Sequence, residues 1–527
     1  MFHQLRFVII SIILLSTVLV PFYRPVWAEE REVPRFEIAW SQDVGSKERE
    51  TLGEHVAQTP DGGFVIVGKK GPGSFLAKLD AEGNVKWNRG YRYGNNLNFN
   101  NVIPTQDGGY LMIGETSNRS TSDMFMLKTD HKGTKQWHQI YSTQSNDPAH
   151  FAVQVKDGGY LVIGRKVLLK LDREGSIRWK SVHRYGEMLQ AVETDEGYLL
   201  SGPGEQILVN HRGEILLKEG TADTSSFHVM TSDGGYIFLT NDRAVKIGTQ
   251  GERQWEQSLA LEENDEIKKM ISTSDGGFAI TIRDEYFGPK LYKYDRSGNK
   301  VGTTMSCKCE EYLDFEEIRA MIETADGGFA YVSYVQGDYP KPLPRLYKTV
   351  PFLVQDSANK LSLSKLTMQM PPKKTATIQA SFIQKDGSKV DVTKDAQWAS
   401  SNRSIVSVSK GTITSKGIGR AKVTVTYKGS QADMWVEVTK KPLLSSVTIS
   451  PDHLYFSNKT GIEWLKATAH YTDGNEYEAT SDVSWYSDDE KVAIVDRYGA
   501  VIVKGSGKTT IHAVNCGVEA SIPVTVE

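Results

Sequence analysis

Five acidic side chains of this 527-residue chain are spaced so that they could act together in catalysis. Asp284 and Glu285 are adjacent, and Glu310, Glu311 and Asp314 form a second group. Two carboxyl groups that flank a sugar at less than about 10 Å can cleave a glycosidic bond. The sequence does not show whether the two groups meet. A carbohydrate-active enzyme is therefore one hypothesis, and it requires a fold that brings these acids together.

Other catalytic patterns are absent from the sequence. Histidines such as His138, His150, His183 and His228 are scattered, without a recurrent partner spacing. No Gly-x-Ser-x-Gly, His-Glu-x-x-His or phosphate-binding loop occurs. We therefore predict no catalytic residue and no cofactor.

Disulfide and metal chemistry have few residues to build on. Cys307 and Cys309 are separated by one residue, which would strain a bridge, and Cys516 lies far away. Two cysteines without a nearby histidine pair do not make a zinc site. Asp488 and Asp489 could hold calcium, but acids in exposed loops usually face water. We predict no bound metal and regard the cysteines as incidental thiols.

The composition and the first residues indicate an exported protein. The net charge is only −3, whereas a nucleic-acid binder normally has a basic domain, so we expect no nucleic-acid partner. Residues 1–28 are typical of a signal peptide, with His3 and Arg6 before an apolar run and Val26-Trp27-Ala28 at the cleavage site. No later segment is long and apolar enough to span a membrane. We expect a secreted or cell-surface protein that is monomeric.

A repeated turn phrase organises the first two thirds of the chain. Asp-Gly-Gly-aromatic, or the variant Asp-Glu-Gly-Tyr at 195–198, lies between two short runs of β-forming residues. Asp and Gly supply the positive φ of a tight hairpin. Successive phrases are 38 to 51 residues apart, which suits a four-stranded propeller blade. The seven phrases begin at Asp61, Asp107, Asp157, Asp195, Asp233, Asp275 and Asp326.

A second phrase, Lys-x-Asp-x-x-Gly-x-x-x-Trp, follows the first and predicts the hairpin between the third and fourth strands. The tryptophans that it places on fourth strands are Trp87, Trp137, Trp179 and Trp255. No such strand follows the seventh turn, but Arg35-Phe36-Glu37-Ile38-Ala39-Trp40 stands alone before the first. We predict that residues 35–41 complete the seventh blade, so that no sheet edge stays open. The propeller would then span residues 35–355.

These phrases resemble the repeats of quinoprotein-like propellers and of secreted bacterial propellers over residues 36 to 350. The resemblance implies a seven-bladed β-propeller but no particular activity, because many functions share this scaffold. Quinone-dependent dehydrogenases of this type use adjacent cysteines and eight blades. Here Lys308 separates the cysteines and seven turns occur.

The tail contains two copies of one further module. Trp398, then Gly411 and an alternating Ala421-Lys422-Val423-Thr424-Val425, recur as Trp485, Gly499 and Thr509-Thr510-Ile511. We predict two tandem immunoglobulin-like β-sandwiches over 360–440 and 443–527. Both resemble the group 2 bacterial immunoglobulin-like domain, which is common in surface and adhesion proteins. The predicted fold class is thus all-β, with a seven-bladed propeller and two sandwiches.

The longest variable segments are predicted on the propeller face opposite both repeated turns. Their aromatic, amide and charged side chains suit sugars or peptides. The candidate ligand-binding residues are Tyr91, Tyr93, Asn96, Asn98, Arg119, Tyr141, Asp147, His150, Tyr286, Glu310, Tyr312 and Tyr339. Our leading hypothesis is a non-catalytic adhesion or binding protein that recognises a glycan, a cell-wall component or another surface protein, with the sandwiches as a stalk. The alternatives are the carbohydrate-active enzyme above and a structural envelope protein.

Overall fold

The computed structural model describes most of the chain after residue 34. The described residues are 35–36, 38–44, 51–118, 121–142, 147–164, 166–182, 188, 190–202, 205–220, 227–231, 233, 235–240, 242–248, 252–259, 261, 265–284, 288–304, 316–335, 344–350, 360–384, 388–440, 442–457, 461–515 and 518–527. The predicted signal peptide and all three cysteines lie outside these ranges. Within them, no helix is long and apolar enough to span a membrane.

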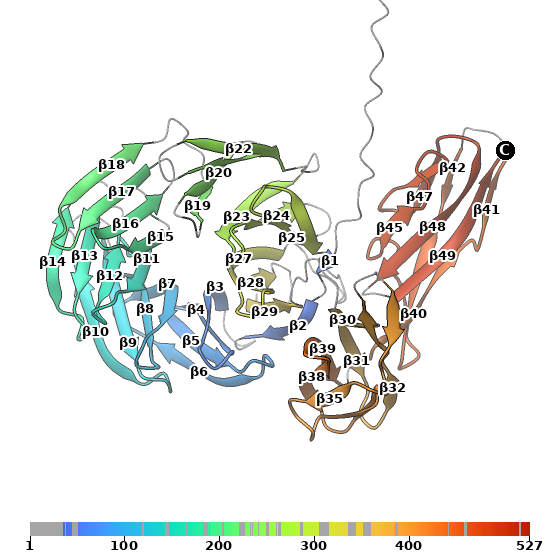
Figure 1. The fold of residues 1–527 in the computed structure, drawn as a ribbon, viewed down its shortest axis with the longest axis horizontal. Helices are drawn as coiled ribbons and strands as arrows, with labels where there is room; N and C mark the ends of the chain where they lie inside the picture. Colours follow the sequence, from blue (N-terminus) through green and yellow to red (C-terminus); the bar gives the residue numbers. More distant parts are fainter. Residues whose placement is uncertain are drawn as a thin grey trace, which may run out of the picture. The chain divides into compact units, whose positions relative to one another are not determined.

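Seven sheets are arranged around an axis as the blades of a propeller (Figure 1). The strands of blades one to three are β3 (Thr51–Gln58), β4 (Phe64–Lys70), β5 (Gly73–Leu79) and β6 (Val85–Tyr91); β7 (Asn96–Pro104), β8 (Tyr110–Asn118), β9 (Thr121–Thr129) and β10 (Lys135–Tyr141); and β11 (Phe151–Gln154), β12 (Tyr160–Ile163), β13 (Val167–Leu171) and β14 (Ile177–Val182). Blades four and five contain β15 (Gln190–Glu193), β16 (Gly197–Gly202), β17 (Glu205–Asn210) and β18 (Ile215–Gly220); and β19 (His228–Met230), β20 (Tyr236–Thr240), β21 (Arg243–Ile247) and β22 (Arg253–Ser258). Blade six contains β23 (Glu266–Ser272), β24 (Phe278–Asp284), β25 (Gly288–Tyr294) and β26 (Lys300–Thr304), and blade seven begins with β27 (Glu316–Glu323), β28 (Phe329–Val335) and β29 (Pro344–Thr349).

The fourth strand of blade seven comes from the other end of the chain. β2 (Ile38–Asp43) pairs antiparallel with β29, with Trp40 opposite Lys348. The two residues of β1 (Arg35–Phe36) pair in parallel with β26 of blade six. The N-terminal segment therefore links the sixth and seventh blades. It closes the ring by strand pairing, because no hairpin turn joins β29 to β2.

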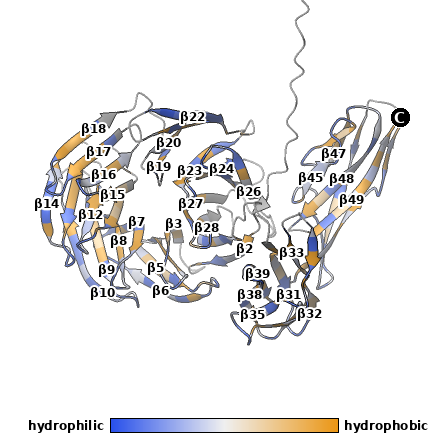
Figure 2. Ribbon diagram, in the orientation of Figure 1, coloured by the Kyte–Doolittle hydropathy of each residue, from blue (hydrophilic) through white to orange (hydrophobic). Residues whose placement is uncertain are grey.

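Apolar side chains of neighbouring blades share their cores. In blade one, β4 and β5 are almost entirely buried, whereas the outer strand β6 is mostly exposed. Val65 and Leu76 of this blade pack with Leu97 and Phe99 of β7 in blade two. Figure 2 shows the resulting concentration of hydrophobic residues in the middle strands. No blade can bury both of its faces alone, so each blade depends on its neighbours for its core.

Two β-sandwiches of identical topology follow the propeller, so the predicted fold class is confirmed. The first contains β30 (Lys360–Leu363), β31 (Thr367–Met370), β32 (Thr375–Thr377), β33 (Ala380–Ile383), β34 (Lys389–Asp391), β35 (Gln397–Ser400), β36 (Val406–Ser409), β37 (Thr412–Ser415), β38 (Gly419–Tyr427) and β39 (Ser430–Val438). The second contains β40 (Leu444–Ser450), β41 (Leu454–Phe456), β42 (Ile462–Trp464), β43 (Lys466–Tyr471), β44 (Glu476–Glu478), β45 (Ser484–Ser487), β46 (Ala493–Val495), β47 (Ala500–Val503), β48 (Gly507–Asn515) and β49 (Val518–Val526). Both have strand orders 1-4-5, 2-10-9-6 and 3-8-7 when their strands are numbered from one to ten. The indole N–H groups of Trp398 and Trp485 make the same 2.9 Å hydrogen bond to the carbonyl five residues earlier.

The first sandwich contacts the closing strand of the propeller. Trp435 of β39 is buried in the same hydrophobic cluster as Trp40 of β2. The guanidinium of Arg420 in β38 donates to the Ser41 carbonyl, pairs with Glu437 at 3.0 Å and lies over the Trp40 ring. These contacts stabilise β2 from its outer side.

Candidate functional site

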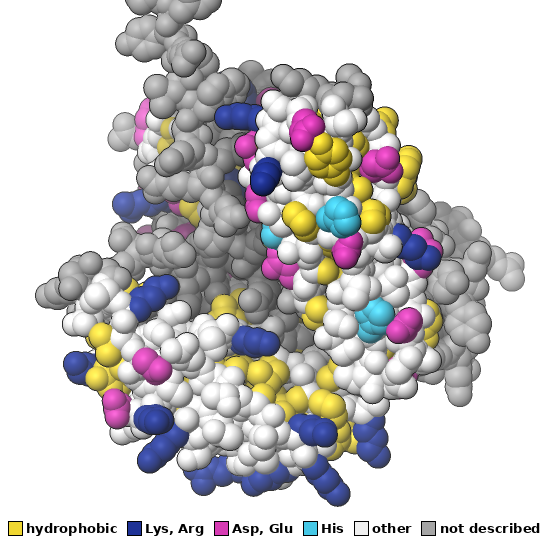
Figure 3. Space-filling model, turned by 90° about the vertical axis from the view of Figure 1, so that its right-hand side faces the viewer, with side chains coloured by type: hydrophobic (Ala, Val, Ile, Leu, Met, Phe, Trp, Pro, Cys, Tyr) yellow, Lys and Arg dark blue, Asp and Glu magenta, His cyan; other side chains and the backbone are white. Residues whose placement is uncertain are grey.

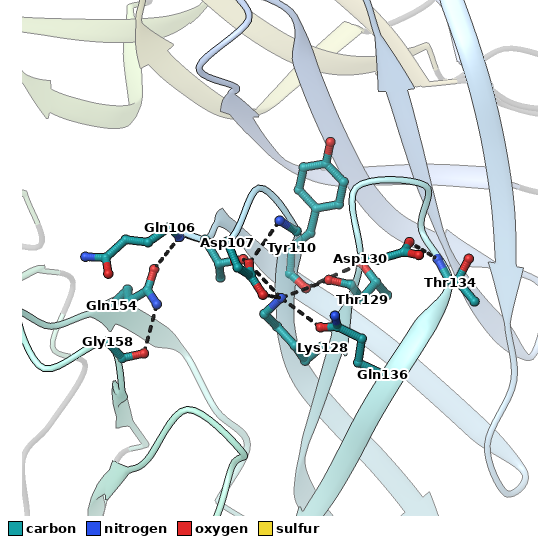
Figure 4. A network of polar contacts seen from close by, with 12 residues as sticks. Gln106, Asp107, Tyr110, Lys128, Thr129, Asp130, Thr134, Gln136, Gln154 and Gly158 are labelled. Atoms are coloured by element: carbon teal, nitrogen blue, oxygen red, sulfur yellow. Dashed lines mark hydrogen bonds and ion pairs between the residues drawn. The ribbon is translucent and has the colours of Figure 1, made fainter.

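The two repeated phrases meet in a buried ion pair (Figure 4). In blade two, Nζ of Lys128 lies 2.7 Å from Oδ2 of Asp107, 2.9 Å from the Thr129 carbonyl and 3.0 Å from Oε1 of Gln136. The Lys128 side chain is 2% exposed and that of Asp107 is 53% exposed. The other pairs of this kind are Lys78–Asp61, Lys170–Asp157, Lys246–Asp233, Lys293–Asp275 and Lys348–Asp326. In six blades, an ion pair thus connects the aspartate of the first turn to a lysine of the third strand.

The pKa of Asp107 reflects these contacts. Partial burial is the largest single influence and would raise the pKa. Hydrogen bonds from Lys128, from the Thr105 hydroxyl and from the Gly109 N–H together outweigh burial and lower the pKa to about 2. The carboxylate is therefore charged at neutral pH and acts as a structural anion.

The two glycines of the turn have different tasks. Gly108 has a φ of 79° and supplies the left-handed residue of the hairpin, as the sequence predicts. A Cβ on Gly109 would lie 2.6 Å from Nζ of Lys128 and 2.1 Å from the Thr129 carbonyl. The second glycine therefore leaves room for the lysine, a role that sequence reasoning missed because the lysine is 19 residues away.

Blade four lacks both members of the ion pair. Its turn is one residue shorter, so Asp195 is displaced and the Thr194 N–H bonds directly to the Gly197 carbonyl. Leu208 takes the position of the lysine, opposite Leu217 where five other blades have tryptophan. Because both partners are missing, no buried charge is left unpaired. Their joint loss is therefore nearly neutral for the free energy of unfolding.

Five tryptophans each fasten one blade to the next. A Cβ on Gly175 of blade three would lie 2.8 Å from the ring of Trp137 in blade two. The same contact joins Trp40 to Gly83, Trp87 to Gly133, Trp179 to Gly213 and Trp255 to Gly298. Blade six has Gly302 at the corresponding position, opposite Lys293. The next blade, blade seven, has no turn between its third and fourth strands. A tryptophan at position 302 of blade six would therefore have no turn glycine to contact.

Neighbouring blades are also joined by polar contacts at the first turns. The Gln106 N–H donates to Oε1 of Gln154 in blade three at 2.8 Å, and Nε2 of Gln154 donates to the Gly158 carbonyl at 2.9 Å (Figure 4). The equivalent Gln58 of blade one accepts from the Ala325 N–H of blade seven at 2.8 Å. Both repeated phrases therefore contribute contacts that close the ring.

A set of β-bulges marks the inner strands at one level of the ring. The pairing of the first strand shifts register at Glu54, Asn100, Lys268 and Arg319 in blades one, two, six and seven. Each of these residues lies seven positions before the aspartate of its turn. A bulge leaves the extra residue outside the ladder and redirects its side chain. All four are half-buried, and their strands are the innermost of their sheets.

The same position is polar in every blade except the fourth. In blade three it is His150, directly before β11, and in blade five it is Ser226, which lies outside the described residues. Blade four, which also lacks the ion pair, has Leu189 directly before β15, likewise outside the described residues.

We call the five described polar residues at this position the channel ring: Glu54, Asn100, His150, Lys268 and Arg319. The channel ring combines two cations, one acid, one amide and one imidazole. Such a ring can orient a polar ligand, and these five described residues include no hydroxyl or thiol nucleophile beside a base.

Two further groups show how polar the inner strands are. The side-chain oxygens of Asn98, Asn100 and Asn101 on β7 are buried and accept no hydrogen bond from the described residues. Burial, with Lys269 of blade six as the second cause, lowers the pKa of His55 on β3 to about 4. Unpaired buried amide oxygens cost free energy unless water or a ligand reaches them. Each of these amide oxygens can therefore accept a hydrogen bond from water or from a ligand.

The predicted ligand-binding residues are distributed over several environments. The hydroxyls of Tyr91 and Tyr141 donate to the carbonyls of Gly133 and Gly175 in the following blades. Tyr93 is 40% exposed and packs on Phe125 at 5.1 Å between ring centroids.

Asp147 is buried and accepts from the Lys166 N–H at 3.0 Å. Asn96 and Asn98 lie on β7, and only residues 92–95 connect β6 to β7. His150 belongs to the channel ring. Arg119, Tyr286, Glu310, Tyr312 and Tyr339 lie outside the described residues, as do Glu285, Glu311 and Asp314 of the acidic groups.

Comparison with known proteins identifies one domain of the chain. Residues 445–526 match the bacterial Ig-like domain (group 2). Ice-binding protein 1 of Shewanella frigidimarina (strain NCIMB 400) is 29% identical over 129 residues, which cover 24% of this chain and 14% of that protein. The assignment of the first sandwich to the same family stays a prediction.

Solved propellers are similar to this chain at low identity. The WD40 domain of Neurospora crassa Pan2 is 7% identical with a TM-score of 0.44 and covers 61% of this chain and 98% of that domain. The structure of YCF48 bound to D1 peptide is 10% identical with a TM-score of 0.42 and covers 61% of this chain and all of that one. By its own strand order and its matched domain, the chain is a propeller protein that ends in a bacterial Ig-like domain of a type found in extracellular and surface proteins.

Proposed function

We propose that this chain is a secreted or cell-surface binding protein whose propeller recognises a polar ligand at the channel ring. The observation that carries the proposal is the recurrence of a bulged, half-buried polar residue at one level of the inner strands. Bulges at corresponding positions of separate blades are not needed for closure, because the turns and tryptophans supply it. A glycan or an extended peptide segment fits best, since both offer many hydroxyl or amide groups to such a ring.

The sandwiches are proposed to carry the propeller at the bacterial surface. The Ig-like domain at 445–526 supports a surface location. The contacts of Arg420 and Trp435 with the closing strand support a fixed attachment of the first sandwich to the propeller.

Glycan and peptide arrays probed with the full chain test the proposal. The double variant Asn98→Ala, Lys268→Ala removes one inner-strand amide and one cation of the channel ring. The matched variant Asn88→Ala, Lys180→Ala removes the same side chains from the exposed faces of outer strands β6 and β14. We expect the first variant to lose at least about tenfold in affinity, in line with two lost polar contacts, and the second to bind as the parent does. Equal binding by the two variants would place the ligand elsewhere.

A further inference from the structure

The two sandwiches have the same fold but opposite charge. Residues 360–440 contain 14 lysines and arginines against five acids, whereas residues 443–527 contain six against 12. Figure 3 faces both sandwiches and shows Lys and Arg side chains concentrated in its lower half and acidic and His side chains in its upper half. Because the fold is shared, it does not dictate this difference.

Backbone hydrogen bonds bring four cations of the first sandwich together. The Lys374 N–H donates to Oγ of Ser415 at 2.9 Å, and the Ser415 N–H donates to the Lys374 carbonyl at 2.9 Å. The Lys416 N–H donates to the Ile405 carbonyl at 2.7 Å, next to the turn that contains Arg403. Lys373, Lys374, Arg403 and Lys416, which we call the cation cluster, are all exposed. None of them has an acidic partner among the residues that the structure describes.

The second sandwich provides a matched comparison. The Val503 N–H bonds to the Gly461 carbonyl as the Ser415 N–H bonds to Lys374, so Gly461 replaces Lys374. The Lys491 N–H bonds to Oδ1 of Asp489 as that of Ser404 bonds to Asn402. Glu490 therefore replaces Arg403. Lys504 keeps the position of Lys416, since its N–H bonds to the Val492 carbonyl at 2.9 Å. The second sandwich therefore retains one cation of the cluster, replaces one by glycine and reverses the charge at one position.

Backbone conformation points the same way. Among the described residues, three non-glycine residues have positive φ, and all three are lysines of the first sandwich: Lys373 at 61°, Lys410 at 48° and Lys428 at 48°. A left-handed non-glycine residue costs about 1 kcal/mol or more. Lys373 belongs to the cation cluster, so one of its charges lies at a position where a non-glycine residue is unfavourable for the backbone.

We propose that the cation cluster binds a linear phosphodiester polymer of the bacterial surface. Lysine ammonium groups bind phosphate as compact point charges, and cations that project from separate turns suit a flexible chain. They do not form the helix or β-ribbon that reads a DNA groove. This site is separate from the channel ring.

Fluorescence titration of the full chain with a labelled synthetic poly(glycerol phosphate) tests the proposal. With about four phosphate contacts, affinity should fall about 50-fold between about 50 and about 200 mM NaCl. Lys374→Ala, Arg403→Ala, Lys416→Ala should reduce the affinity at least about tenfold and the salt slope by about 2. Lys365→Ala, Lys389→Ala, Lys394→Ala removes three other exposed lysines of this sandwich and should leave both unchanged.

Equal losses in the two triple variants would show a diffuse charge effect and overturn the proposal. Tighter binding of duplex DNA or of phosphatidylglycerol vesicles than of the polymer would also overturn it. Ile418 is 58% exposed beside Lys416, and in the second sandwich Ser506 follows Lys504 and Gly505 in the same way. Ile418→Ser should not weaken polymer binding, whereas a lipid-binding surface would lose affinity with it.

Discussion

Asp107→Ala should destabilise blade two more than Lys128→Met does, although the two side chains form one ion pair. Removal of Asp107 leaves the Lys128 ammonium, which is 2% exposed, with the Thr129 carbonyl and Gln136 as its remaining partners among the described residues. Breaking a fully buried pair costs about 3–5 kcal/mol. Because Asp107 is half-exposed and water can replace part of its contribution, we expect about 2–3 kcal/mol.

Lys128→Met removes the charge that is difficult to solvate. Asp107 then faces water and keeps its hydrogen bonds from Thr105 and Gly109, so the cost should be about 1 kcal/mol. The double variant should cost no more than Lys128→Met alone, because it reproduces the situation of Leu208 in blade four.

Hydrogen exchange of peptides from β8 and β9 measures these differences in the full chain. A loss of about 2–3 kcal/mol should speed exchange about 30- to 150-fold. Glu196→Ala, in the blade-four turn that has no lysine opposite, is the control and should change exchange in β16 and β17 less than about threefold. If Asp107→Ala and Lys128→Met accelerate exchange equally, the buried ammonium is not the source of the cost.

The acid dependence of Asp107→Ala follows from the pKa. Asp107 has an ordinary pKa of 3.8 when unfolded and one of about 2 when folded. A depressed pKa contributes stability that is complete above the unfolded value and is lost as the pH falls toward the folded value. The difference between parent and Asp107→Ala should therefore be constant at neutral pH and shrink between pH 3.8 and about 2.

Three further changes should have defined effects. His228 is 7% exposed, and burial lowers its pKa from 6.5 to about 4, so stability should fall as the pH drops from 6.5 toward 4 and His228→Phe should weaken this pH dependence in thermal melts. Trp137→Leu removes the ring that packs on Gly175 and should cost about 1–2 kcal/mol, read as faster exchange in β10 and β14. Arg420→Ala removes the hydrogen bond to the Ser41 carbonyl and should speed exchange in β2 about tenfold.

Each of these changes has a contrasting result. Equal melting shifts of parent and His228→Phe between pH 6.5 and about 5 would assign the pH dependence to other groups. Trp137→Leu should leave β20 and β21 unchanged, and a uniform acceleration would mean that the ring unfolds as one unit. Arg403→Ala, on an exposed turn of the same sandwich, should not affect β2, and an effect equal to that of Arg420→Ala would contradict a specific contact.

Local turn chemistry made the architecture predictable. The left-handed glycines Gly108 and Gly133 are required within a few residues of Asp107 and Asp130. Short phrases therefore reveal each hairpin, and the number of phrases reveals the number of blades. The lone strand around Trp40 could be assigned to the seventh blade because every other blade has four strands. The two sandwiches were predictable for the same reason, since Trp398 and Trp485 introduce the same order of strands.

The candidate site depended on the tertiary structure. The second glycine of each turn and its lysine are close only because the second and third strands pair in the sheet. Residues 96–101 are rich in asparagine, which disfavours strands, yet pairing with β8 makes them part of β7. Glu54 and Arg319 are 265 positions apart in the chain, and only closure of the ring places their bulges at one level. Sequence thus determined the repeating unit, whereas the contacts between units decided which polar side chains lie at one level of the first strands.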